Sequence, residues 1–568
     1  MNTELRFLLA IGLMLVVLVG TNLLFPPIPP EEPIPADSVA PAAQVDTGRA
    51  EDPALLEGLV AEAQPEAEVE VPSPEEAQAA PEALVTVEGP LYRFTFSNIG
   101  ARLVTAEMSQ FEDLNHQGIV DLIPEGANGY FGQKLVVGSD TVDLGSVPFQ
   151  VEPAGGLTLS EGGGTEELRF VYQHPTLPFS FEVSYAFDPA LYRVQVRGNV
   201  VGVDRPLLIT DLGEGLPYVE ADSVGESRAM AYVENHLNEG IRSHPLTRAE
   251  PGVVEGPLLW AALRSKFFVM ALLAGEDEEE TAEEDLLGGL LLSGDTDGGP
   301  IRIAAAQTVG RDGSFGYRIF AGPQEHARLS SLGEDLEEVN PYGWKFFRPI
   351  VRPFVSIIIG ILSFLHDRLN LGYGWVLIVF GVLMRVVLFP LNQKAMRSQL
   401  KNMAVQPLVQ EIQAKHKENP ERLQKEMMKL YKEHGFNPLA GCWPMLLPWP
   451  VLIALFFTFQ NTIEFRGVPF LWLPDLSAPD PLYLLPLFLG ISMFLLQWVS
   501  MRSMPTQNPQ MKMMMYVMPV MMVFIFFQLA SGLNLYYATA NIATLPQQMY
   551  IANERKKAQA KAPLTLST

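Results

Sequence analysis

The residue in this sequence with the clearest capacity for chemistry is Arg385, which stands inside an apolar run from Tyr373 to Leu391. As a helix, that run is just long enough to cross a hydrocarbon core of roughly 30 Å. Arg385 lies about 18 Å from its start, at a rise of roughly 1.5 Å per residue. A guanidinium inside a bilayer costs roughly 2.5 kcal/mol or more. Arg385 therefore either extends to the nearer interface or faces a wet cavity, where it can form charge-assisted hydrogen bonds with an anion.

The last apolar segment, from Asn534 to Ile551, carries a polar stripe. Its polar residues follow at intervals of three and four, which places them on one helical face: Asn534, Tyr537, Asn541, Thr544 and Gln548. Other apolar segments also carry polar residues, among them Thr458, Gln497 and Gln528. Gly381 precedes Arg385 by one helical turn and shares its face.

These polar groups have two explanations. Hydrogen bonding between helices would account for the amides and the threonine. It does not account for Arg385, because no carboxylate stands in the apolar segments that could pair with it. The pattern favours water in a shared cavity, or a partner that arrives from outside the protein.

The bulk composition indicates a membrane part and an acidic soluble part in one chain. The 568 residues carry a net charge of -26, yet 48% of them are hydrophobic. The single cysteine, Cys442, excludes an internal disulfide and a Cys-rich zinc or C-x-x-C redox site. The eight histidines show no metal-ligand spacing, and no G-x-S-x-G, H-E-x-x-H or phosphate-binding loop is present. We expect no enzyme activity, no cofactor and no metal.

Two segments precede the first regular pattern. Residues 1–25 contain an apolar run that predicts an N-terminal transmembrane anchor with its N-terminus in the cytoplasm. A secretory signal peptide is the alternative, but no A-x-A site follows the run. Residues 26–83 are rich in Pro, Ala and Glu, a composition typical of a disordered acidic linker.

Residues 84–335 predict a large all-β domain. Short runs alternate between apolar and polar residues, as in 179–187, and Gly, Pro, Asn and Asp clusters separate them. This pattern is typical of an antiparallel β-sandwich or barrel. After it, residues 340–367 mix aromatic and basic side chains and predict an amphipathic helix in the membrane interface, with a second full span as the alternative.

Four more apolar spans follow the Arg385 segment, at 439–462, 482–500, 513–530 and 534–551. We expect a tight turn at Ser531-Gly532. The fold class is thus an α-helical polytopic membrane protein with six spans, whose five-span core covers 373–551, plus the β domain. A basic tail, 552–568, ends the chain. Six spans place both termini inside.

The segment 392–437 is the most basic stretch near any span, so it fixes the inner side of the membrane. Apolar residues at helical spacing and the Asn419-Pro420 pair predict a helical hairpin. Its cationic residues are candidates for recruiting a partner: Lys401, Lys415, Lys417, Arg422, Lys425 and Lys429. The alternative is a loop whose charges only set the orientation.

Several motifs in this order resemble the bacterial branch of the YidC/Oxa/Alb family of membrane protein insertases. They lie at 384–391, at Gln406-Pro407, at 424–431, at 437–442, at 531–537 and at Gln547-Gln548. Phe320-Ala-Gly-Pro323 extends the resemblance more loosely into the β domain.

The resemblance implies a protein that inserts and helps fold inner-membrane proteins, alone or with the Sec translocon, through a hydrophilic groove in the inner leaflet. It implies that Arg385 attracts acidic residues of a substrate and that substrate helices pass Gly381, Tyr536 and Tyr537. With the polar residues above, the predicted groove comprises Arg385, Gly381, Gln497, Gln528, Asn534, Tyr536, Tyr537 and Asn541.

The implied partners are nascent membrane proteins, the Sec translocon, the ribosome and membrane lipids, with no specific nucleic-acid sequence. The implied location is the bacterial inner membrane, with the β domain in the periplasm. Two other classes stay open at this point. A small-solute transporter would use Arg385 as its binding charge, but no inverted repeat is apparent. A membrane-anchored periplasmic binding protein would place the function in the β domain.

Overall fold

The computed structural model describes residues 81–390 apart from 116–117, 139, 276–284, 295–299 and 341–347, and then 449–501 and 509–561. Between 391 and 448 it describes positions 393, 412, 415, 422, 423, 425, 426, 428 and 429, and between 501 and 509 none. The predicted anchor, almost all of the linker and the end of the predicted tail lie outside these residues, as does Cys442. The chain divides into a β unit, within Ala50–Tyr342 together with Asn461–Gly467, and a helical unit made of the remaining segments.

The β unit is built from strands with two short helices, α3 (Ser223–Ala229) and α4 (His326–Ser331). The strands are β1 Leu84–Glu88, β2 Arg93–Ser97, β3 Arg102–Glu112, β4 Ile119–Asp121, β5 Gln133–Val137, β6 Asp140–Asp143, β7 Gln150–Glu152, β8 Leu157–Thr158, β9 Glu166–Gln173, β10 Ser180–Phe187, β11 Arg193–Val201, β12 Leu207–Gly213, β13 Ala231–His236, β14 Gly240–Pro245, β15 Gly252–Arg264, β16 Phe268–Ala274, β17 Leu287–Ser293, β18 Arg302–Thr308 and β19 Ser314–Pro323.

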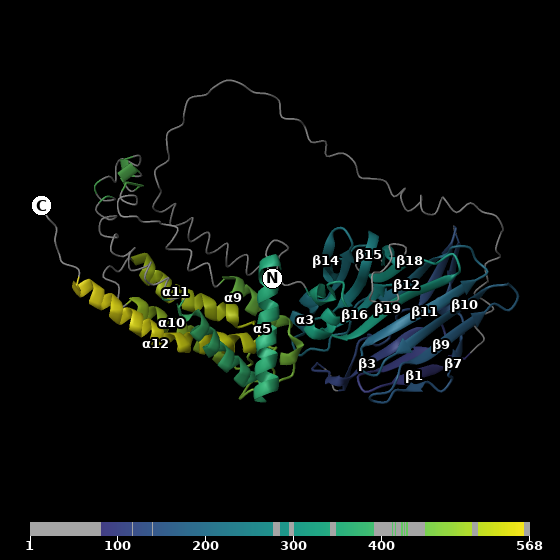
Figure 1. Ribbon diagram of the computed structural model, residues 1–568, viewed down its shortest axis with the longest axis horizontal. Helices are drawn as coiled ribbons and strands as arrows, with labels where there is room; N and C mark the ends of the chain where they lie inside the picture. The colour runs from purple at the N-terminus through teal and green to yellow at the C-terminus, as the bar shows by residue number, and fades with distance from the viewer. Residues whose placement is uncertain are drawn as a thin grey trace, which may run out of the picture. The chain divides into compact units, whose positions relative to one another are not determined.

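These strands form two sheets. A 14-stranded sheet runs β6-β5-β12-β18-β17-β15-β16-β19-β11-β10-β9-β7, with β13 paired to β15 and β14 paired to β13, and a five-stranded sheet runs β4-β3-β2-β1-β8. Their neighbours pair antiparallel, except that β1 and β8 are parallel. Figure 1 shows β1 and β3 beside β7 and β9 at one end of the unit. The large antiparallel β domain predicted from the sequence is confirmed.

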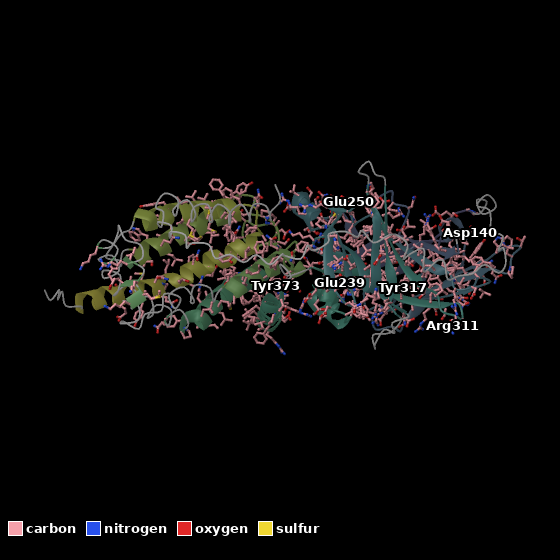
Figure 2. The ribbon with its side chains drawn as sticks, turned by 90° about the horizontal axis from the view of Figure 1, so that it is seen from above. Asp140, Glu239, Glu250, Arg311, Tyr317 and Tyr373 are labelled. Atoms are coloured by element: carbon pink, nitrogen blue, oxygen red, sulfur yellow. The ribbon has the colours of Figure 1, made fainter. Side chains whose placement is uncertain are left out.

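Aromatic side chains join the two sheets. Phe96 of β2 lies 4.9 Å from Tyr185 and 6.0 Å from Phe187 of β10, between ring centroids. The alternation in β10 buries one face of that strand against the other sheet. Central strand β16 is different: all seven of its residues are buried, because both of its faces are covered. Tyr317 of β19, labelled in Figure 2, is fully buried and accepts a hydrogen bond of 2.8 Å from Gln133 of β5.

The helical unit contains α5 (Arg348–Leu369), a helix at Tyr373–Pro390, α9 (Trp449–Asn461), α10 (Leu484–Met501), α11 (Pro509–Phe526) and α12 (Ser531–Lys561). In Figure 1, α10 lies between α11 and α12, in agreement with its contacts to both. Among the described residues, only Tyr373–Pro390 is long and apolar enough by itself to cross a membrane. Val451–Asn461, Leu484–Ser500 and Tyr516–Phe526 are shorter apolar stretches. The number of six spans stays a prediction.

Two details differ from the sequence-based expectation. The tight turn predicted at Ser531-Gly532 is wrong: the chain reverses over 527–530, and Ser531 begins α12. There, the backbone N–H of Gly532 donates to the carbonyl of Leu476 over 2.8 Å, so both residues belong to the helix start. In addition, α12 continues past Ile551 to Lys561, because its charged end is as compatible with a helix as its apolar part.

Candidate functional site

Arg385 lies in the last part of the helix Tyr373–Pro390 and is half-buried. Its Nε is inaccessible to solvent and has no hydrogen-bond partner among the described residues. No ion pair with Arg385 is found within that same part of the chain. The guanidinium interacts electrostatically with the phenol groups of Tyr536 and Tyr537 on α12. The structure thus brings together three of the predicted groove residues.

Tyr536 holds three helices together. Its ring lies 5.6 Å from Phe380 of the Arg385 helix and 5.7 Å from Phe459 of α9, and only 4% of the residue is exposed. Tyr537 lies 5.3 Å from Tyr536 and packs edge-on against Phe526 of α11, also at 5.3 Å. Arg385 therefore lies near an aromatic cluster to which four helices contribute.

Gly381 is buried at the contact between its helix and α12. A Cβ at this position would lie 3.2 Å from Cγ2 of Thr539 and 3.4 Å from the carbonyl oxygen of Tyr536. These distances are tight, so the absence of a side chain lets the two helices approach one turn away from Arg385. Gly381 contributes close packing to this site.

The polar stripe of α12 is partly used for helix packing. Asn541 donates a hydrogen bond of 3.1 Å to the hydroxyl of Ser492 on α10. Asn534 donates 3.1 Å to the carbonyl of Phe526, the last residue of α11. Thr544 donates to the carbonyl of Ala540 in its own helix. The explanation by interhelical hydrogen bonds thus holds for Asn534 and Asn541.

The glutamines of the predicted polar surface lie on α10, on α12 and in the turn between α11 and α12. Gln497 is half-buried on α10, and Gln528 is exposed in the turn after α11. Gln548 is half-buried near the middle of α12. Among the described residues, no contact joins Gln497 or Gln548 to Arg385. Ser492 was not predicted as a site residue, because a single serine hydroxyl within an apolar helix is a weak signal.

Several buried polar atoms in the helical unit lack a partner among the described residues. Besides Nε of Arg385, they are Oγ1 of Thr458, Oδ1 of Asn534 and Nε2 of Gln547. Leaving such groups unpaired costs roughly 1–3 kcal/mol each. Buried polar atoms of this kind are commonly satisfied by ordered water. These atoms come from three helices: the Arg385 helix, α9, and α12, which contributes both Asn534 and Gln547.

The opposite end of the Arg385 helix is covered by the segment that precedes α10. Phe470 packs edge-on against Trp375 at 5.5 Å, and a Cβ on Gly374 would collide with its ring. Ser531 at the start of α12 donates 2.9 Å to the carbonyl of Asp475. Tyr373, labelled in Figure 2, stacks on His366 of α5 at 4.1 Å. Ring packing and a side-chain hydrogen bond to the backbone thus join the segment before α10 to this end of the Arg385 helix and to the start of α12.

A separate apolar hollow of about 480 Å³ lies between α10 and α12. Its walls include Leu485, Phe488, Ile491, Leu535 and Ile542, with Trp472 at one side. None of the predicted groove residues lines it. The hollow is therefore a different feature from the cluster around Arg385.

Of the predicted recruitment residues, Lys415, Arg422, Lys425 and Lys429 are helical and exposed. Lys401 and Lys417 lie outside the described residues, as does most of 392–437. The prediction of a hairpin here stays untested.

Comparison with known proteins agrees with the two units. Residues 84–357 match the family described as the YidC periplasmic domain, and residues 364–559 match the family described as 60Kd inner membrane protein. The membrane protein insertase YidC of Chlorobium luteolum is 30% identical over 557 residues, which are 90% of this chain and 90% of that protein. The same protein of Chlorobaculum tepidum is 30% identical over 522 residues, or 85% of each chain.

The chain belongs to the YidC membrane protein insertase family. A solved YidC insertase with its first transmembrane domain resolved is 18% identical and matches 84% of this chain and 96% of that chain, with a TM-score of 0.33. Like the family, this is a non-enzymatic inner membrane protein with a periplasmic domain, and its function is membrane protein insertion. The insertase hypothesis is confirmed, in preference to the transporter and the binding protein.

Proposed function

We propose that this insertase works through a hydrated groove that reaches only halfway across the membrane and is centred on Arg385. The Arg385 helix, α9, α10, α11 and α12 would enclose it. Arg385, Gly381, Gln497, Gln528, Asn534, Tyr536, Tyr537 and Asn541 are the residues to which we assign it. The observation that carries the proposal is the half-buried Arg385 beside Tyr536 and Tyr537, with a buried Nε that has no partner among the described residues.

Two further observations support a groove that is open at one end. The buried unpaired atoms of Thr458, Asn534 and Gln547 fit a site that holds water. At the other end, Phe470 packs on Gly374 and edge-on against Trp375, and backbone hydrogen bonds join the residues before α10 to the start of α12. Water would thus enter the groove at the Arg385 end of the helix Tyr373–Pro390 and would not reach its Trp375 end.

The energetics of insertion follow from this arrangement. A polar tail cannot cross hydrocarbon cheaply, because its groups lose their hydrogen bonds to water. A groove that is wet to half the membrane depth shortens the dry distance. Arg385 would hold an acidic group of the tail by charge-assisted hydrogen bonds. The adjoining apolar segment then partitions into lipid, which supplies the driving force without a nucleotide.

The wider organisation belongs to the same proposal. Residues 1–25 form an anchor, 26–83 a linker, 84–335 the periplasmic β domain, 340–367 an interfacial helix and 373–551 the insertase core. The chain spans the inner membrane six times, with both termini in the cytoplasm. The basic hairpin at 392–437 and the tail at 552–568 face the cytoplasm, where Lys401, Lys415, Lys417, Arg422, Lys425 and Lys429 receive the ribosome and nascent membrane proteins. The protein acts alone or with the Sec translocon, among membrane lipids.

Site-specific photo-crosslinking tests the groove. A photoreactive residue replaces Tyr537, or Gln497, in the full chain, and ribosomes stalled on a short single-span membrane protein are added. Both positions should crosslink to the nascent helix. Leu471, which is 73% exposed in the segment at the closed end, serves as the control and should not crosslink at the same stage. If Tyr537 and Gln497 fail to crosslink in folded protein, or Leu471 crosslinks equally, the groove is refuted.

A further inference from the structure

The segment Asn461–Gly467, called here the docking segment, begins at the last residue of α9 but belongs to the β unit. It contains one short 3-10 turn at Ile463–Phe465. Ile463 is 4% exposed and is a member of the hydrophobic core of the β unit, and Phe465 is 1% exposed. More than a hundred residues of sequence separate this segment from the last strand, β19. The core of the β unit is therefore completed by residues that lie between two apolar helices.

Arg466 forms a buried ion pair inside the β unit. Its Nε donates a hydrogen bond of 2.6 Å to Oε1 of Glu220, and its Nη2 donates 3.2 Å to the carbonyl of Val219. The guanidinium also lies 5.2 Å from the centre of the Phe268 ring on β16. Only 4% of each charged side chain is exposed. A buried pair of this geometry is specific, because each charge is costly without the other.

The surroundings of Glu220 are arranged for a cation. Glu226 of α3 is also buried, and its carboxylate accepts a hydrogen bond of 2.9 Å from the backbone N–H of Glu220. Arg466 and Lys266 act electrostatically on both carboxylates. Burial raises the pKa of Glu220 and of Glu226, and Arg466 opposes the rise at both. Two buried acids on the β unit thus receive a guanidinium from the docking segment.

The backbone that presents Glu220 is itself fixed. The carbonyl of Val219 accepts from the backbone N–H of Leu114 at 2.9 Å, and the carbonyl of Tyr218 accepts from the Asn115 side chain at 3.1 Å. The backbone at 218–219 is thus held by hydrogen bonds from residues of the β unit outside the docking segment. The guanidinium of Arg466 binds there, at Glu220 and at the carbonyl of Val219.

We propose that the Glu220–Arg466 pair fastens the docking segment into the β domain, so that the domain is bound at the α9 end non-covalently as well as through the chain at 341–347. Arg466 is then a positioning residue for the docking segment, which continues directly from α9. Removal of the β domain would leave Ile463, Phe465 and Arg466 without their burial sites.

Retention of the β domain after cleavage tests this directly. Protease sites are inserted after Ala80 and after Gly343 in the full chain, which is reconstituted in lipid and cut at both sites at pH 7. The released fraction of the β domain is then measured. In the uncut protein the β domain stays attached through the intact chain. In the doubly cut native protein, most of the β domain should still be retained, held non-covalently by the docking segment.

Three variants complete the test. Arg466→Ala should raise the released fraction at least tenfold. Arg466→Lys should give a released fraction between those of the native protein and Arg466→Ala, because lysine keeps the charge but cannot make both guanidinium hydrogen bonds. Arg93→Ala, which removes an exposed arginine that pairs with Glu88 on the same unit, should match the native protein. Full release of the native domain, or native retention by Arg466→Ala, would overturn the proposal.

Amide exchange separates release from misfolding. In the Arg466→Ala protein, protection should fall at least tenfold at 461–467 and at 218–226, whereas β10 and β11 should keep native protection. Loss of protection throughout the β unit would mean that Arg466 supports the whole fold and not the docking segment in particular, which also contradicts the proposal. The assay is independent of insertion activity, so its failure leaves the groove around Arg385 untouched.

Discussion

Replacing Glu220 by Gln should remove a specific pH dependence of the β unit. Burial raises the pKa of this carboxyl from 4.5 to about 7, in spite of the neighbouring Arg466. The folded protein therefore holds the proton more tightly than the unfolded chain. The stabilisation is fully present below about pH 4.5 and is lost as the pH rises through 7. Gln does not titrate, and its side-chain oxygen can still accept the hydrogen bond from Arg466.

The magnitude follows from the shift. A difference of about 2.5 pKa units corresponds to roughly 3 kcal/mol, at about 1.4 kcal/mol per unit. Between pH 5 and pH 8, the free energy of local opening at 218–226 should thus fall by up to about 3 kcal/mol more in the native protein than in Glu220→Gln. Amide hydrogen exchange of the full chain measures this free energy in the native protein and in Glu220→Gln, after correction for the pH dependence of the intrinsic exchange rate. Equal pH dependence of the two proteins would refute the reasoning.

The remaining predictions concern the helical unit. Tyr536→Ala should lower the free energy of unfolding by roughly 3–5 kcal/mol, because it empties the space between Phe380 and Phe459, whereas Tyr536→Phe should retain most stability in thermal unfolding. Gly381→Leu should cost roughly 1–3 kcal/mol by overpacking against Thr539; a native melting temperature would contradict this contact. A double-mutant cycle on Asn541→Ala and Ser492→Ala should give a coupling of about 1 kcal/mol, and no coupling would mean that the hydrogen bond is absent.

The β domain and the Arg385 helix were predictable because their patterns are local. Alternation over 180–187 shows which face of β10 is buried, and an uninterrupted apolar run defines the helix that carries Arg385. The polar stripe of α12 was also visible from spacing. Which residues of the stripe pack between helices and which belong to the site could not be predicted, because this depends on which neighbouring helix each residue faces. Asn541 is bonded to Ser492, whereas Tyr537 lies near Arg385.

The docking segment could not be found from sequence. Ile463 and Phe465 resemble ordinary apolar residues at the end of a span, and Arg466 resembles a surface charge in a loop. Only the fold brings Arg466 to Glu220, 246 positions earlier in the chain. The turn at Ser531 was misplaced for a related reason. Serine and glycine suit a turn, but Ser531 and Gly532 satisfy their backbone groups at a helix start, against residues of the segment before α10.

The most direct test of the account is the insertion rate of a single-span substrate whose translocated tail carries one acidic residue, beside the same substrate with that residue neutralised. Arg385→Ala should slow the acidic substrate at least tenfold and leave the neutral one nearly unchanged, with Arg385→Lys between them. If Arg385→Ala inserts the acidic substrate at the native rate, or slows both substrates equally, Arg385 does not act by holding an anionic tail in a hydrated groove.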